Sequence, residues 1–332
     1  MLKKIYKSLV LLPALALVLA GCGAQGDPQG QAPGESSQEY QLLMATGGTG
    51  GTYYPLGGAM AETWKKHIEG LNVTVQSTGA SVENLRLLAS GETELAMAMN
   101  GPAAQAIAGT GDFEGAPIDF VAVGVIYPEV MQIIAPADRG FVDVADLKGK
   151  RVSIGPPGSG TASAARTILA AYDIDPDQDI TLFQDNFTDA ARKLKDGMLD
   201  AAFAVLAVPA SNVEEITTAT DVTIVNIDGE GLEKILADDP TFSPYEIPGG
   251  TYKGQDGVSK TISQWAVLYT TKDLPDDLVY EMTKVMYEKA SETALAHARG
   301  DQILLETALL GIEPVPLHPG AERFYKDVGL LD

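Results

Sequence analysis

Short apolar runs alternate along most of the chain with segments in which apolar residues recur at helical spacing. The apolar run at residues 41–45 predicts a buried strand, and residues 56–68 carry Met60, Trp64 and Ile68 on one helical face. Further strands are predicted at residues 71–76, 94–99, 120–126, 131–135, 152–154, 180–183, 201–205, 222–227 and 265–270, and further helices at residues 189–196, 231–237 and 275–298. Because strands and helices alternate, we expect parallel α/β lobes.

The length of the chain and one short connecting segment predict its domain organisation. With 332 residues the chain exceeds one typical domain, which suggests two lobes with separate cores. Tyr127-Pro128-Glu129 separates two predicted strands and is a natural crossing point between the lobes. We therefore expect lobe 1 to comprise residues 41–127 plus 263–332, and lobe 2 to comprise residues 128–262. The turn-rich segment 238–263 is expected to be irregular, and a segment of that length is uncommon unless it is functional.

Several predicted strands end in loops of small residues that lead into helices. The loops are TGGTGGTYYPLGG at residues 46–58, STGAS at 77–81, Asn100-Gly101-Pro102, and GPPGSGT at 155–161. Glycine lets the backbone approach a ligand closely, the first N–H groups of a helix attract anions, and Ser81 is a plausible N-cap. Ligands of open α/β sheets collect at the carboxyl ends of the strands. The recurrence of this construction predicts a small-molecule pocket rather than a set of tight connections.

The sequence argues against nucleotide binding and against catalysis. Gly48 and Gly50 are followed by Tyr53 where the dinucleotide fingerprint has its third glycine, and no Gly-Lys-Ser/Thr follows. The three histidines are isolated, and Gly158-Ser159-Gly160 lacks the first glycine of a nucleophile elbow. We therefore expect no catalytic residues, no cofactor and no bound metal.

The N-terminus has the features of an export signal. A basic start precedes an apolar run and the ending Leu19-Ala20-Gly21-Cys22, so residues 1–22 are predicted to be a signal peptide. The ending resembles the bacterial lipobox, in which Cys22 becomes the lipidated N-terminus; an ordinary signal peptide with a chance cysteine is the alternative. Residues 23–40 have the composition of a flexible tether. We expect a lipid-anchored protein at the outer face of a bacterial membrane, in the periplasm or at the cell surface.

The charge of the chain limits its partners. The chain carries 45 acidic and 23 basic residues, a formal net charge of −22, which repels nucleic acid and anionic lipid surfaces. A solvated acidic surface accounts for most of this charge. A small anion would then have to be captured by local donors against the overall field.

Together these motifs resemble the TAXI family, the TRAP-associated extracytoplasmic immunogenic proteins. The resemblance rests on the lipobox, TGGTGGTYYPLGG, the run from Thr78 to Glu92, the segment 154–169 and Tyr252-Lys253-Gly254-Gln255. It implies a type II periplasmic-binding-protein fold with a ligand cleft between two α/β lobes. It also implies a small organic acid or acidic amino acid of the glutamate or 2-oxoglutarate class as ligand, and an ion-gradient-driven TRAP permease as membrane partner.

The resemblance also implies which residues bind the ligand. Carried onto this chain, they are Thr52, Tyr53, Thr78, Gly79, Ala80, Ser81, Asn100, Ser159, Gly160 and Thr161. Tyr53, Tyr54 and Tyr252 are candidates to cover the ligand, whereas surface roles are expected for Arg86 and Arg166. Residues 204–209 are more apolar than the family pattern, which leaves the identity of the acid open.

Three other functions remain open at this point. A receptor of an ATP-driven importer for another small solute would have the same loops. An enzyme would turn over its bound ligand, and a surface adhesin would bind no small ligand.

Overall fold

The computed structural model describes residues 39–332, which belong to one compact unit. The predicted signal peptide, its Cys22 and the tether as far as residue 38 lie outside the described residues. The strands are β1 (Tyr40–Ala45), β2 (Leu71–Gln76), β3 (Leu95–Met99), β4 (Val121–Pro136), β5 (Arg151–Ser153), β6 (Thr181–Phe183), β7 (Ala201–Leu206), β8 (Val222–Val225), β9 (Ser243–Ile247) and β10 (Ser259–Thr270). The helices are α1 (Tyr53–His67), α2 (Ser81–Ser90), α3 (Asn100–Ala108), α4 (Gly160–Ala171), α5 (Phe187–Lys195), α6 (Ser211–Ala219), α7 (Gly229–Asp238), α8 (Asp276–Glu288), α9 (Ala290–Ala296) and α10 (Pro319–Asp327). Short 3₁₀ helices occupy Gly111–Phe113, Ala137–Arg139, Val144–Leu147, Ala298–Gln302 and Leu305–Thr307.

The strands form one mixed sheet in the order β2-β1-β3-β10-β4-β7-β5-β6, with β8 paired to β4 and β9 paired to β10. Strands β1, β2 and β3 are parallel at one end, and β5, β6 and β7 are parallel at the other. The long strands β4 and β10 pair antiparallel with each other and connect the two parallel groups. The α/β class and the parallel groups expected from the sequence are therefore present.

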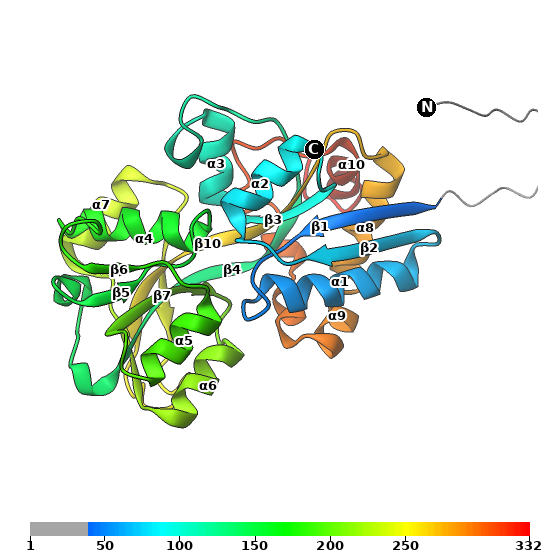
Figure 1. Cartoon of the computed structure of the whole chain (residues 1–332). Helices are drawn as coiled ribbons and strands as arrows, with labels where there is room; N and C mark the ends of the chain where they lie inside the picture. The colour runs from blue at the N-terminus through cyan, green and yellow to red at the C-terminus, as the bar shows by residue number, and fades with distance from the viewer. Residues whose placement is uncertain (1–38) are drawn as a thin grey trace, which may run out of the picture. The chain divides into compact units, whose positions relative to one another are not determined.

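The helices are distributed over two groups of strands, as Figure 1 shows: α1, α2, α3, α8, α9 and α10 lie around β1–β3, and α4–α7 lie around β5–β7. The apolar clusters divide in the same way. Val123 at the start of β4 belongs to a cluster with α1, α8 and α10, whereas Ile133 near its end belongs to a cluster with α4 and α7. The exact lobe boundaries given above stay a prediction.

The structure corrects the expected break at Tyr127-Pro128-Glu129 between two strands. Residues 120–126 and 131–135 are not two strands parted by Tyr127-Pro128-Glu129, because all three residues lie inside the single strand β4. Pro128 and Glu129 are paired with Trp265 and Gln264 of β10, and the register shifts nearby, between Ala266 and Val267. Such an irregularity lets a strand accommodate a proline, which cannot donate to the ladder.

Three further expectations need correction. The helix expected over residues 275–298 is divided into α8 and α9, because the backbone leaves helical geometry at Lys289. The segment 238–263 is not wholly irregular, since it contains β9 and the start of β10. Ser81 is the first residue of α2 rather than its N-cap, and its hydroxyl oxygen accepts a hydrogen bond from the backbone N–H of Met99 at 3.2 Å.

Candidate functional site

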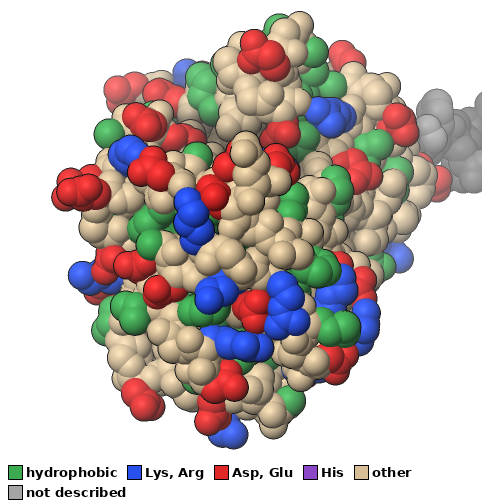
Figure 2. Space-filling view, turned by 60° about the vertical axis from the view of Figure 1, so that its left-hand side comes forward, with side chains coloured by type: hydrophobic (Ala, Val, Ile, Leu, Met, Phe, Trp, Pro, Cys, Tyr) green, Lys and Arg blue, Asp and Glu red, His purple; other side chains and the backbone are tan. Residues whose placement is uncertain are grey.

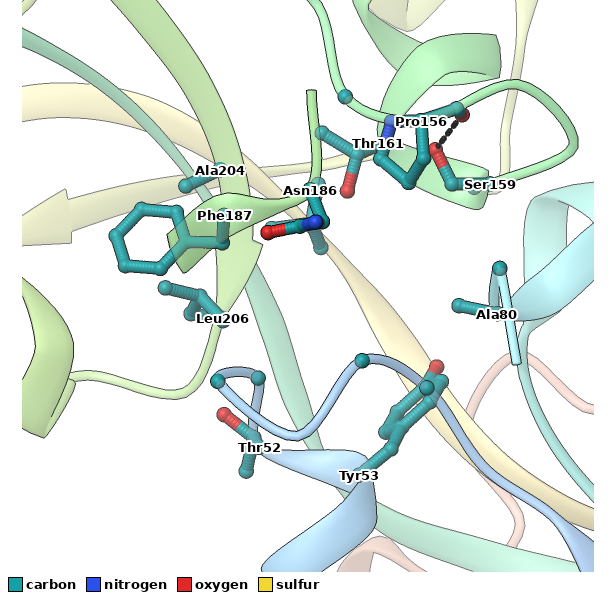
Figure 3. A pocket seen from close by; sticks show the side chains of 18 of the residues that line it. Thr52, Tyr53, Ala80, Pro156, Ser159, Thr161, Asn186, Phe187, Ala204 and Leu206 are labelled. Atoms are coloured by element: carbon teal, nitrogen blue, oxygen red, sulfur yellow. Dashed lines mark hydrogen bonds between the residues drawn. The ribbon is translucent and has the colours of Figure 1, made fainter. Parts of the chain in front are cut away.

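A cavity of about 460 Å³ lies where the carboxyl ends of the strands of both groups meet. Its wall is built by the loop after β1, the loop after β2, the loop between β5 and α4, the loop between β6 and α5, and the end of β7. The residues drawn in Figure 3 surround a common space, with Thr52, Tyr53 and Ala80 on one side and Pro156, Thr161 and Asn186 on the other. The cavity therefore draws its wall from both ends of the sheet.

Four helices begin at this cavity: α1, α2, α4 and α5. The backbone N–H groups of Gly160 and Thr161 in α4, and of Phe187 and Thr188 in α5, have no hydrogen-bond partner among residues 39–332. Helix starts carry partial positive charge and unpaired donors. The cavity can therefore bind an anionic group through backbone amides.

The loop after β1 reaches the residues that follow β7. The Thr52 hydroxyl oxygen accepts a hydrogen bond from the backbone N–H of Ala207 at 3.3 Å. A Cβ atom added at Gly50 would lie 2.2 Å from the Thr188 hydroxyl oxygen at the start of α5. Glycine at this position thus lets the first loop approach α5 closely.

The loop after β2 is held by its own hydrogen bonds. The Thr78 hydroxyl group accepts a hydrogen bond from the backbone N–H of Ala80 at 3.0 Å and donates one to Asn84 Oδ1 at 2.5 Å. Ala80 has a left-handed φ of +80°, which is uncommon for a residue other than glycine. The backbone N–H of Glu83 donates to the carbonyl oxygen of Gly158 at 3.1 Å, so this loop also touches the loop before α4.

The loop before α4 ends in an N-cap. The Ser159 hydroxyl oxygen accepts from the backbone N–H of Ala162 at 3.0 Å and donates to the carbonyl oxygen of Pro156 at 2.7 Å, the bond drawn in Figure 3. The Ser159 side chain is therefore committed to the protein. Thr161 is directed into the cavity in Figure 3, and its hydroxyl group has no partner among the described residues.

One side of the cavity carries a buried carboxyl group. Glu129 is 3% exposed, and its Oε1 accepts a hydrogen bond from the Tyr127 hydroxyl group at 3.0 Å. Glu129 Oε2 and the Tyr53 hydroxyl group are both buried without a well-formed hydrogen bond among the described residues, and Tyr53 lies close enough to Glu129 to influence its pKa. Burial raises the pKa of Glu129 to about 8, and the neighbouring phenol groups only partly oppose this rise. The carboxyl group is thus largely neutral at pH 7 in the ligand-free protein.

The charged residues in the cavity wall are all acidic. Among the described residues, Glu129, Asp185 and Asp189 line the cavity, and no lysine or arginine does. Asp185 Oδ1 accepts from Lys193 Nζ at 2.6 Å, which balances one of these charges. On the face shown in Figure 2, acidic and basic side chains are mingled rather than gathered by sign. Anion binding here depends on backbone and hydroxyl donors.

The structure brings together nine of the ten predicted ligand-binding residues. Thr52, Tyr53, Thr78, Gly79, Ala80, Ser81, Ser159, Gly160 and Thr161 line the cavity, and Asn100 does not. The Asn100 side chain donates to the carbonyl oxygen of Gly311 at 3.1 Å and accepts from the backbone N–H of Trp265 at 2.9 Å. Whether the nine residues touch a ligand stays a prediction.

The other candidates lie elsewhere. Tyr54 and Tyr252 do not line the cavity, and the Tyr252 hydroxyl group is buried between Ala210 and Gln132. Arg86 donates to the carbonyl oxygen of Asp112, and Arg166 pairs with Asp177, so neither arginine reaches the cavity.

Sequence reasoning missed two parts of the wall. One is the start of α5, where Asn186 caps the helix by accepting from the backbone N–H of Asp189 at 3.0 Å. A signal was present, because an Asn-x-x-Asp pattern after a predicted strand is typical of a helix start. The other part is Tyr127 and Glu129, whose place inside an apolar strand gave no local signal.

Two further properties concern residues 39–332. No helix there has the length and apolarity to cross a bilayer. No group of three His, Cys, Asp or Glu side chains there is arranged to hold a metal ion.

The fold is that of the type II periplasmic solute-binding proteins, as similarity to solved structures shows. A structure from work on glutathione import via GshT and the cystine ABC importer TcyBC of Streptococcus mutans matches with a TM-score of 0.51 and 13% identity, over 82% of this chain and 98% of that chain. MatC from Rhodopseudomonas palustris with bound malate matches with a TM-score of 0.51 and 13% identity, over 87% and 97%. The alkanesulfonate-binding protein SsuA from Xanthomonas axonopodis pv. citri has a TM-score of 0.48 and 19% identity, over 87% and 84%.

The amino-acid sequence shows the family to which the chain belongs. The model of the NMT1-like family matches residues 44–329, which is most of the described chain. The protein therefore belongs to the NMT1-like family. The narrower resemblance to TAXI proteins stays a prediction.

Proposed function

We propose that this protein is an extracytoplasmic receptor that captures a small organic acid or acidic amino acid and delivers it to a membrane transporter. The observation that carries the proposal is the cavity on which four helix starts converge. Unpaired N–H groups of α4 and α5 supply donors for a carboxylate, and the hydroxyl group of Thr161 adds a further one. The glutamate or 2-oxoglutarate class is the ligand class that we propose.

Capture is proposed to proceed by closure around the ligand. Hydrogen bonds join the two groups of elements around the cavity, such as those from the backbone N–H of Glu83 to Gly158 and from the backbone N–H of Ala207 to Thr52. A ligand that touches both groups would favour the closed arrangement in proportion to its extra contacts there. The transporter would then recognise the closed form.

A thermal-shift screen tests the ligand class. The mature protein, purified after refolding to remove any bound solute, is heated with dicarboxylates, oxo acids and acidic amino acids, and with sugars and polyamines as controls. We expect a rise in melting temperature with at least one acid, since a ligand that binds only the folded state stabilises it. A rise with a control class and none with any acid would refute the ligand assignment.

Two kinds of transporter are candidates for the partner. The sequence motifs support a TRAP permease, whereas similarity to the Streptococcus mutans structure, from a system that includes a cystine ABC importer, supports an ATP-driven importer. The ATP-driven importer is the partner that the comparisons support better. Uptake of the ligand into proteoliposomes that contain the candidate transporter separates the two, because one requires ATP inside the vesicle and the other an ion gradient across it.

The cellular location is part of the same proposal. We propose that Cys22 is lipidated and becomes the N-terminus after removal of residues 1–21, and that residues 23–40 tether the folded part to the membrane. Mass spectrometry of the N-terminal peptide from the natural host tests this, with a diacylated or triacylated Cys22 as the expected result. An N-terminus at another residue without lipid would refute it.

A further inference from the structure

One corner of the cavity wall is apolar. It is formed by Ala204 and Leu206 at the end of β7 and by Phe187, the first residue of α5. Phe187 packs against the apolar cluster that contains Ala204 and Leu206, and Figure 3 shows the three side chains on the same side of the cavity. None of these three side chains has a hydrogen-bond donor or acceptor. We call these three residues the apolar corner.

The apolar corner adjoins the donors that the proposed function assigns to a carboxylate. Phe187 belongs to both, because its ring forms part of the apolar corner while its backbone N–H is a donor at the start of α5. Thr188 supplies the next N–H along the helix, and neither N–H has a partner in the described part of the chain. A carboxylate bound at the start of α5 therefore has the neighbouring atoms of its own molecule within reach of the Phe187 ring.

A second carboxylate would be unfavourable in the apolar corner. A charged group that leaves water without gaining a partner is costly. No lysine or arginine of the described chain lines the cavity, and the charged residues that flank Phe187 along the chain are Asp185 and Asp189. The buried Glu129 is close to Tyr53, which lies across the cavity from Phe187 in Figure 3. An apolar group, in contrast, gains free energy when it leaves water.

We propose that the ligand is a monocarboxylate with an apolar tail, whose carboxylate is held at the starts of α4 and α5 and whose tail occupies the apolar corner. The inference rests on the proposed receptor function. It keeps one carboxylate of the glutamate and 2-oxoglutarate class and replaces the group at the far end of the molecule with an apolar one. A cavity of about 460 Å³ lies within the usual range of ligand pockets and has room for both parts.

Matched ligand pairs test the proposal without any mutation. Titration calorimetry compares glutarate with 5-methylhexanoate and 2-oxoglutarate with 5-methyl-2-oxohexanoate, because in each pair an isopropyl group replaces the second carboxylate at nearly the same shape. We expect each branched acid to bind roughly ten- to hundredfold more tightly than its partner, as burial of an isopropyl group would give. Equal or tighter binding of the dicarboxylates would overturn the inference and leave the receptor function intact. No binding by any member of either pair would count against the proposed capture of an organic acid, and the inference would fail with it.

The variant Phe187→Thr assigns the preference to the apolar corner. Affinity for the branched acid should fall roughly tenfold, and affinity for the matched dicarboxylate should change little, because threonine keeps the backbone N–H and removes the ring. Phe187→Leu keeps an apolar side chain and should retain most of the preference. An equal loss for both members of a pair, or an unchanged preference in Phe187→Thr, would refute the assigned role of this side chain.

Phe141→Thr is the matched control. Phe141 is also a half-buried phenylalanine, it packs against the cluster that contains residues of α4 and α7, and it does not line the cavity. The control is expected to lower the melting temperature and to leave the preference for the branched acid unchanged. A loss of preference in Phe141→Thr as large as that in Phe187→Thr would show that the effect comes from general loosening of the fold, and would overturn the inference.

Discussion

Gly160 is a position where the two groups of elements approach each other closely beside the cavity, and Gly160→Ala tests whether that approach matters for binding. A Cβ atom there would lie 2.4 Å from Met99 Sδ, 2.7 Å from the Ser81 hydroxyl oxygen and 3.1 Å from Ser81 Cβ. The contacted atoms belong to β3 and α2, whereas Gly160 begins α4. Ordinary contacts between such atoms are about 3.5–4 Å, so the neighbours must move by about 1 Å.

The expected loss of ligand affinity follows from this overlap. Overpacking of this kind typically costs about 1–3 kcal/mol, and Ser81 has little freedom to yield because its hydroxyl oxygen is bonded to the N–H of Met99. Separation of the two groups would relieve the overlap, so we expect the cost to fall on the closed form. About 1.4 kcal/mol corresponds to a tenfold change in affinity, and we therefore expect a roughly five- to hundredfold weaker ligand affinity.

Calorimetry with the ligand found in the screen, together with small-angle scattering with and without ligand, measures the effect. The ligand-free variant should keep its melting temperature within a few degrees, because alanine is itself a better helix former than glycine. Gly58→Ala in α1 is the matched control, since a Cβ atom there meets nothing within 4 Å. That control should stabilise the protein by up to about 1 kcal/mol and leave affinity unchanged. Wild-type affinity and ligand-induced compaction in Gly160→Ala would refute the reasoning.

Three further predictions concern stability. The pKa of Glu129 is about 8 in the folded ligand-free protein against an ordinary 4.5, so between these pH values the folded protein holds a proton that the unfolded chain has lost. The free energy of unfolding should therefore fall by about 1.4 kcal/mol per pH unit from pH 4.5 to 8, relative to the variant Glu129→Gln. Denaturation curves of the two proteins that stay parallel across this range would contradict the prediction. Arg151 holds the pKa of Asp200 down to about 2, so the stability that this pair contributes is present above pH 4 and is lost as the pH falls through 2. In urea denaturation, Asp200→Asn should be less stable than wild type by about 1–2 kcal/mol at pH 7 and nearly as stable near pH 2. A difference in stability that stays constant with pH would contradict the prediction. Tyr252→Phe removes a buried hydroxyl group that donates to Gln132 Oε1 at 2.6 Å and accepts from the N–H of Ala210 at 2.9 Å. The variant should lose about 1–3 kcal/mol of stability in chemical denaturation and keep its ligand affinity, since Tyr252 does not line the cavity. An affinity loss larger than the stability loss would contradict this.

The parts of the site that could be predicted from sequence are those with a local cause. A strand followed by glycine, serine or threonine and then a helix places its loop at the carboxyl edge of the sheet whatever surrounds it. That reasoning placed Thr52, Ser81 and Thr161 at one cavity. The same reasoning would also have predicted Asn186 in the cavity wall, because its helix-capping pattern is equally local.

The parts that could not be predicted depend on distant segments. Asn100 follows a strand just as the other loops do, but Gly311 and Trp265, far along the chain, take its side-chain hydrogen bonds. Glu129 lies in a strand whose pairing with β10 continues through Pro128, and local pattern suggested a break there. Its burial at the cavity arises only when α1 and β10 are in place.

The central claim is that helix starts from two separate groups of strands enclose one small acid. Native mass spectrometry of the mature protein, gently purified and then incubated with a panel of organic acids and amino acids, tests it most directly. The account predicts one bound acid per chain, with the bound fraction reduced in Gly160→Ala. A protein that binds no member of the panel, or that retains only a co-purified solute without a carboxylate, would contradict it.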